Sequence, residues 1–236
     1  MKLKSITISL FVLLSFAKIF AQEGSFIIGA DGAYYLPFGG LGDRFNGTIG
    51  GSFFLGEQVS NDWTWIGKIE YLKYSDLNKD AMFKSVTVPE LNNEVFEIPL
   101  PKLKMSLEVF SLSAEAEYKL FDLDFMQTYV NLGFGFYKWA FSRGEYYDSL
   151  FVDSLGTGKM MKVDELKVIA LNLKDISGGF NFGFDLDFPI TKNILFTLAT
   201  NYKMIIASIW ATLALDLEEV SGFQMIEFRS GIKLRL

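Results

Sequence analysis

The sequence predicts an all-β protein, an eight-stranded antiparallel up-and-down barrel whose strands cross a membrane. Two observations predict this fold. Apolar residues alternate with polar or small residues through most of the chain after Gln22, and a period of two belongs to strands with one apolar face. The alternating segments are joined by connections that are in turn short and long, which is the asymmetry of transmembrane β-barrels.

The clearest alternation is the run GGFNFGFDLDF at 178–188. Its phenylalanines and Leu186 share one face, whereas glycine, Asn181 and two aspartates share the other, and no helix sorts side chains in this way. The same alternation predicts strands at 26–34, 48–56, 63–74, 110–120, 130–137, 178–188, 196–203 and 226–236.

The connections divide into two classes by length. Short, turn-like connections are predicted at 57–62, 121–126 and 189–193, and long ones at 37–46, 75–103, 143–177 and 205–222. We expect the short turns on the periplasmic side and the long loops outside the cell. Residues 86–95 and 163–173 are expected to extend the strands above the membrane as hairpins.

Residues 1–21 read as a secretory signal peptide, which leaves one barrel domain at 22–236. Lys2 and Lys4 form the basic start, ITISLFVLLSF is the apolar stretch, and Ala21 is the expected last residue before cleavage. An uncleaved anchoring helix is the alternative, but it needs about 20 apolar residues. Lys18 interrupts this run, so we expect cleavage.

Composition excludes several functions. The chain has no Cys and no His, which removes Ser-His and Cys-His nucleophilic sites and His-ligated zinc. The formal net charge of −6 disfavours nucleic acid as a partner, because binding its backbone needs a basic face. We therefore expect no enzymatic activity and no cofactor.

Alternation alone fits two barrels with opposite faces, a membrane barrel and a soluble lipocalin-like barrel. Small residues on the polar face, such as Gly133 and Gly183, suit the narrow lumen of eight strands, because on a solvated surface they would only weaken the strands. Aromatic residues also cluster where strands would meet the membrane interfaces. These residues are Trp63, Trp65, Phe121 and Phe125 near the short turns, and Tyr34, Tyr71, Tyr74, Trp139 and Tyr202 near the long loops.

The last residues, SGIKLRL, alternate to the final leucine. This segment resembles the C-terminal signal that the barrel-assembly machinery of the bacterial outer membrane recognises. Ser230, Gly231, Leu234 and Leu236 fill its positions, with Leu236 in place of the usual aromatic residue. The whole pattern resembles the OmpA/OmpX-type barrel superfamily, as in Bacteroidetes-like outer-membrane proteins. The resemblance implies an outer-membrane location and contact with lipid and lipopolysaccharide, and we expect a monomer.

The polar face carries enough charge to cross-link the interior. Paired carboxylates such as Glu115 with Glu117 could serve acid–base chemistry or a metal ion. Structural pairing is favoured, because an unpaired buried charge is costly and several Lys and Arg residues, Lys233 among them, share this face. The predicted lumen salt-bridge network comprises Asp31, Lys68, Glu70, Glu115, Glu117, Asp185, Asp187, Lys203, Glu227, Arg229 and Arg235.

The long loops hold apolar and aromatic residues that could contact a ligand, or could pack on one another or on lipopolysaccharide. These candidate contacts are Phe83, Phe96, Tyr146, Tyr147, Phe151 and Trp210. The predicted function is a non-enzymatic membrane scaffold whose extracellular loops serve binding or envelope integrity. A narrow passive, porin-like channel and a soluble lipocalin-like lipid-binding barrel are the alternatives.

Overall fold

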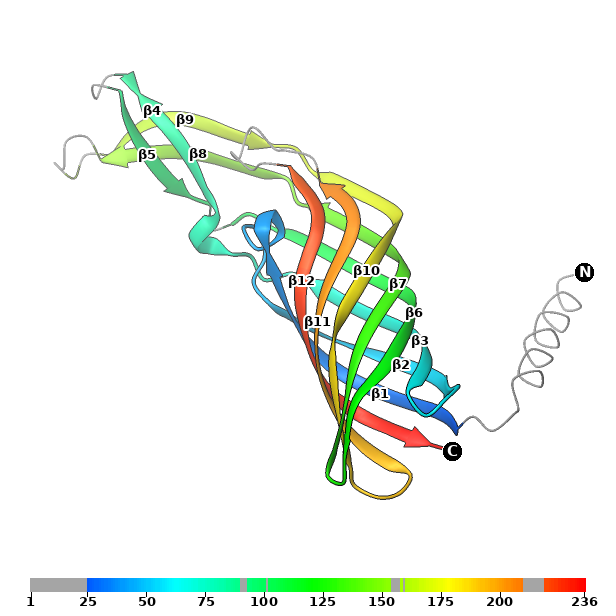
Figure 1. Cartoon of the computed structure of the whole chain (residues 1–236). Helices are drawn as coiled ribbons and strands as arrows, with labels where there is room; N and C mark the ends of the chain where they lie inside the picture. The colour runs from blue at the N-terminus through cyan, green and yellow to red at the C-terminus, as the bar shows by residue number, and fades with distance from the viewer. Residues whose placement is uncertain (1–24, 90–92, 101, 154–157, 159, 210–218) are drawn as a thin grey trace, which may run out of the picture.

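The computed structural model describes residues 25–89, 93–100, 102–153, 158, 160–209 and 219–236 (Figure 1). The predicted signal peptide at 1–21 therefore lies outside the described residues. Eight antiparallel strands close into one barrel, which confirms the predicted fold class. In chain order these strands are β1 (Ser25–Phe38), β2 (Thr48–Gln58), β3 (Trp63–Tyr74), β6 (Met105–Leu123), β7 (Met126–Arg143), β10 (Leu171–Pro189), β11 (Ile194–Ile209) and β12 (Val220–Arg235).

The barrel closes between its first and last strands. β1 pairs with β2 on one side and with β12 on the other, and Ile28 lies opposite Leu234. The backbone N–H of Leu236 donates to the carbonyl oxygen of Phe26 at 2.8 Å. Closure gives hydrogen-bond partners to the backbone N–H and C=O groups that an open edge would leave unpaired. Inside a membrane no water is present to bind those groups.

The two ends of the barrel differ (Figure 1). Short turns join β2 to β3, β6 to β7 and β10 to β11 at one end, here called the turn end. The opposite, hairpin end carries two separate two-stranded sheets and two short 3₁₀ helices. These elements are β4 (Phe83–Val88) with β5 (Glu94–Pro99), β8 (Tyr146–Asp153) with β9 (Met160–Val168), η1 (Gly39–Leu41) and η2 (Lys79–Ala81).

Some loop boundaries were predicted wrongly. The extension expected at 86–95 lies within the β4–β5 hairpin, but the second hairpin begins at Tyr146 rather than near 163. Residues 171–177 belong to β10, because its ladder with β7 runs up to the pair Leu171–Arg143. Residues 205–209 and 220–222 likewise belong to β11 and β12.

The apolar face of the barrel points outward. Phe182 and Phe184 are half exposed, whereas their neighbours Asn181 and Asp185 are 1% exposed. This direction excludes the lipocalin-like alternative, whose apolar face would point into the barrel. Within the described residues, no helix is long and apolar enough to span a membrane.

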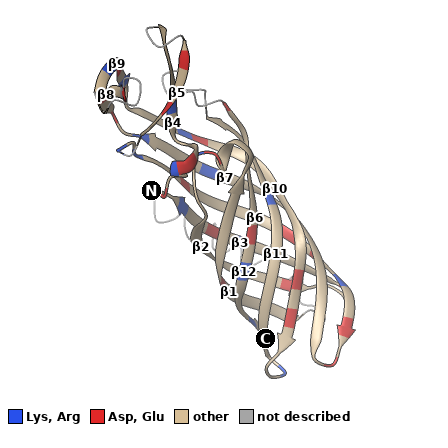
Figure 2. Cartoon of the chain, turned by 90° about the vertical axis from the view of Figure 1, so that its left-hand side faces the viewer, with Lys and Arg blue, Asp and Glu red and all other residues tan. Residues whose placement is uncertain are grey.

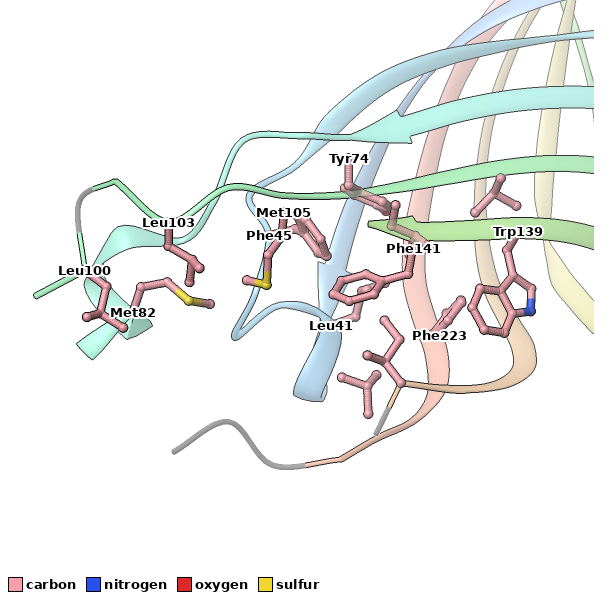
Figure 3. Close-up of a cluster of buried hydrophobic side chains, with 14 of the residues drawn as sticks. Leu41, Phe45, Tyr74, Met82, Leu100, Leu103, Met105, Trp139, Phe141 and Phe223 are labelled. Atoms are coloured by element: carbon pink, nitrogen blue, oxygen red, sulfur yellow. The ribbon is translucent and has the colours of Figure 1, made fainter. Parts of the chain in front are cut away.

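The interior has two layers of different chemistry. Charged and amide side chains, with a small apolar cluster of Ile27, Phe54 and Ile66, fill the part nearer the turn end, and a large apolar cluster fills the part nearer the hairpin end. Figure 3 shows this cluster, in which Trp139 lies beside Phe223 with ring centroids 5.3 Å apart. The prediction that Tyr74 and Trp139 face the outer membrane interface is therefore wrong, because both side chains point inward and are buried.

The apolar cluster continues from the barrel into the hairpins. Leu72, Tyr137 and Phe223 belong to its barrel part, and Val88 and Val168 to its hairpin part. Val168 lies opposite Tyr146 in the β8–β9 ladder, so the inner face of that hairpin joins the same core. Packing of this kind fixes the hairpins on the barrel.

Candidate functional site

Basic and acidic residues occur along the barrel strands (Figure 2). Inside the barrel they form a network built around cations that reach between strands. Lys203 Nζ on β11 lies 2.5 Å from Glu70 on β3 and 3.4 Å from Glu227 on β12. β3 and β11 stand directly opposite each other in the ring of eight strands, so the Lys203–Glu70 pair crosses the whole lumen. All three side chains are buried.

Arg229 on β12 lies at the centre of the network. Its guanidinium lies 3.2 Å from Asp185 and 3.5 Å from Asp31. Asn131 donates to the same Asp185 at 2.7 Å, and Ser52 donates to Asp31 at 2.8 Å. Each of these carboxylates is therefore paired with a cation and accepts a hydrogen bond from a neutral side chain, and both contacts offset the cost of burying its charge.

A second crossing pair lies nearer the turn end. Lys233 on β12 reaches Glu117 on the opposite strand β6 at 3.2 Å and Asp187 on β10 at 2.9 Å. Thr197 also donates to Asp187, at 2.7 Å. These contacts tie four strands together from inside the barrel, because Thr197 lies on β11.

Lys68 pairs with its neighbouring strand. Its Nζ lies 2.7 Å from Glu115, and Asn181 donates to the same carboxylate at 3.1 Å. Asn201 donates to Glu227 at 3.3 Å. Asn131, Asn181 and Asn201 were not among the predicted site residues, although the alternation of the sequence places them on the same face as the charged residues.

The structure places ten of the eleven predicted network residues in ion pairs inside the barrel. The eleventh, Arg235, lies at the turn end and donates to Gln127 at 2.7 Å and to the Tyr129 hydroxyl at 3.2 Å. Lys233, which the sequence also places on this inward face although it is not among the eleven residues, holds two carboxylates.

Glycines make room for the network where strands and side chains come closest. A Cβ atom at Gly133 would lie 2.4 Å from Asn181 Oδ1 and 2.6 Å from Glu115 Cγ. At Gly183 it would lie 2.1 Å from the backbone oxygen of Thr200. Alternation of glycine with long charged residues is thus what lets eight strands enclose so many charges.

The described lumen is filled. Beside Arg229 and Lys233 a gap of about 10 Å³ is left, which is room for about one water molecule. The apolar cluster closes the lumen above the network. Among the described residues, no three carboxylates are grouped so that they could hold a metal ion.

The predicted loop contacts differ in accessibility. Tyr147 and Phe151 are 55% and 46% exposed, whereas Phe83 and Phe96 are half-buried. Tyr146 is 4% exposed, so its prediction as a surface contact is wrong. It packs in the apolar cluster and donates to Asp148, and burial raises the pKa of Tyr146 to about 12. Trp210 lies outside the described residues.

The four residues of the resembled assembly signal lie on β12 and at its end. Ser230, Leu234 and Leu236 are exposed on the outer face. Gly231 faces inward, where a Cβ atom would lie 2.4 Å from the backbone oxygen of Ala30 on β1. Glycine at this position allows the close approach of the two strands that close the barrel.

Solved structures of outer-membrane barrels are similar to this chain over nearly its whole length. A major outer membrane protein from Thermus thermophilus is 9% identical with a TM-score of 0.59, covering 91% of this chain and 100% of that one. The chain has the fold of the small outer-membrane β-barrels. That fold, with an apolar exterior and a charged interior, is the arrangement of a barrel whose strands cross a membrane.

Two further structures have lower TM-scores but higher sequence identities. Neisserial surface protein A is 14% identical with a TM-score of 0.48, covering 91% of this chain and 100% of that one. Ail, the attachment invasion locus protein of Yersinia pestis, crystallised with sucrose octasulfate, is 15% identical with a TM-score of 0.41, covering 90% and 97%. No protein-family model and no curated protein sequence matches the chain.

Proposed function

We propose that the protein is a non-enzymatic outer-membrane scaffold, a filled barrel that holds two extracellular hairpins in place for binding. The observation that carries this proposal is the single apolar cluster that runs from the barrel lumen into both hairpins. A rigid base that positions exposed segments suits recognition. The paired network carboxylates support the absence of acid–base catalysis, because each is already engaged by a cation.

The outer face of the β8–β9 hairpin offers the binding surface. Tyr147 and Phe151 are exposed there, and the ammonium of Lys167 lies 5.3 Å from the centre of the Tyr147 ring. A hollow of about 590 Å³ lies along the same face. Exposed aromatic rings next to charged groups are typical of residues that dominate binding energy.

We expect the double substitution Tyr147→Ser with Phe151→Ser to abolish surface binding, because it removes the exposed aromatic area and leaves the buried core intact. Vesicles that carry the protein would be applied to arrays of glycans and matrix proteins, and a bound component would be titrated. Ile190→Ser, which removes a similarly exposed residue at the turn end, is the control. Equal loss of binding in both variants would contradict the assignment of this surface.

We also propose that Ser230, Gly231, Leu234 and Leu236 form an assembly signal and that residues 1–21 direct export. Leu236→Ser is expected to lower assembly in the outer membrane several-fold while leaving refolding into vesicles unchanged, because the Leu236 side chain is 73% exposed. The measurement is the folded fraction on an unboiled gel, from cell membranes and after refolding. Normal assembly of the Leu236→Ser variant in cells would contradict the proposal that these residues form an assembly signal.

A further inference from the structure

We propose that a notch in the barrel wall between β10 and β11 binds a single-chain amphiphile. The β10–β11 ladder ends at the pair Gly179–Ile205, although both strands continue. β10 stays paired with β7 as far as Leu171, and β11 resumes its pairing with β12 at Ser208–Ser221 after a bulge. Among the residues that the structure describes, the two strands therefore part above Gly179, and the wall opens sideways there.

The opening leads into a preformed pocket of about 570 Å³. Trp139, Leu173 and Met204 supply apolar lining, and Lys174, Ser208 and Glu219 supply polar groups. The indole of Trp139 is fixed, because it packs against Phe223 (Figure 3). Its Nε1–H also donates to Ser177 Oγ at 3.0 Å. An apolar lining with a few placed polar groups is typical of sites for small molecules.

The position of the pocket selects the class of ligand. On the outer surface the apolar residues Phe136 and Phe180 give way to Lys138, which lies opposite Ile176. A charged outward residue marks the level at which the hydrocarbon core ends. A pocket that opens sideways at this level can admit an alkyl chain from the bilayer while the head group stays in the polar interface.

The pocket is a site of binding rather than passage. Ile205 and Phe223, on the inward faces of β11 and β12, are completely buried, and the ion network lies beyond them. The volume is within the range of about 300 to 1,000 Å³ that holds one small ligand. One alkyl chain with a small head group fits these limits.

The test uses Trp139 as the reporter. The full protein with Trp63, Trp65 and Trp210 replaced by Phe is reconstituted in phosphatidylcholine vesicles and titrated with dibromostearate, whose bromines quench indole fluorescence on contact. We expect saturable quenching. Ala207→Phe, which fills the notch, and Ile206→Asp, which puts a charge on its exposed edge, should each weaken binding at least about tenfold. Ala114→Phe, on the lipid face of β6, should leave it unchanged.

Two results would overturn the proposal. The first is quenching that rises linearly with the mole fraction of dibromostearate and is the same in the notch variants and in Ala114→Phe. The second is equal saturable quenching by a brominated two-chain phosphatidylcholine, which would assign the notch to bulk bilayer lipid. Migration on an unboiled gel confirms that each variant is folded before it is titrated.

Discussion

Lys203→Met is expected to lower the free energy of unfolding by about 3 to 5 kcal/mol. The substitution leaves Glu70 and Glu227 buried inside the barrel without the cation that lies between them. It also removes one of the two ion pairs that join opposite walls of the barrel in the described part of the chain. Urea unfolding from lipid vesicles, followed by tryptophan fluorescence, measures the change.

The chain offers a matched control for this substitution. Lys73 pairs with Glu108 at 2.6 Å on the outer face, where both side chains are nearly half exposed. An exposed pair is worth about 0 to 1 kcal/mol, so Lys73→Met should have a small effect. Equal effects of the two substitutions would mean that the network does not stabilise the barrel from inside.

Phe184→Arg is expected to lower the free energy of unfolding by about 2 to 4 kcal/mol, because it places a charge among lipid chains, in the middle of the outward apolar run Phe180–Phe188 of β10. Phe184→Leu, which keeps an apolar side chain, should be much milder. The same urea unfolding experiment measures both. Similar stability of the two variants would contradict the assignment of this face to lipid.

Gly183→Ala, on the lumen side of the same strand, is not expected to be a mild substitution. In the structure a Cβ atom at Gly183 would lie 2.1 Å from the Thr200 backbone oxygen, so β10 and β11 would have to separate. Alternation predicts which way a residue points, but the space around it depends on how the strands are registered.

The alternation of the sequence predicted the eight strands and the direction of most side chains, because side chains of a strand alternate whatever their surroundings. It failed where an aromatic residue could suit either environment. Trp139 was assigned to the membrane interface on its chemistry, yet it shares the inward parity of Gly133 and Gly135. If the alternation is continued past Tyr137, Trp139 falls on the inward face, where the structure has it.

The partners within the network could not be predicted from the sequence. Lys203 and Glu70 are 133 positions apart, and their contact depends on which strands face each other across the closed ring. The lengths of the hairpins also could not be predicted from the alternation of residues within single strands. Tyr146 is a core residue because β8 pairs with β9 and the inner face of this hairpin joins the apolar cluster of the barrel.

Planar-bilayer recording of the purified protein tests the central claim, that the barrel is a filled scaffold. The network cations and their carboxylates occupy the lumen, and the apolar cluster lies above them. With folded, inserted protein confirmed by its unboiled gel migration, we expect no conductance above the bare bilayer. Stable, ion-selective single-channel openings would contradict the account and favour a narrow channel.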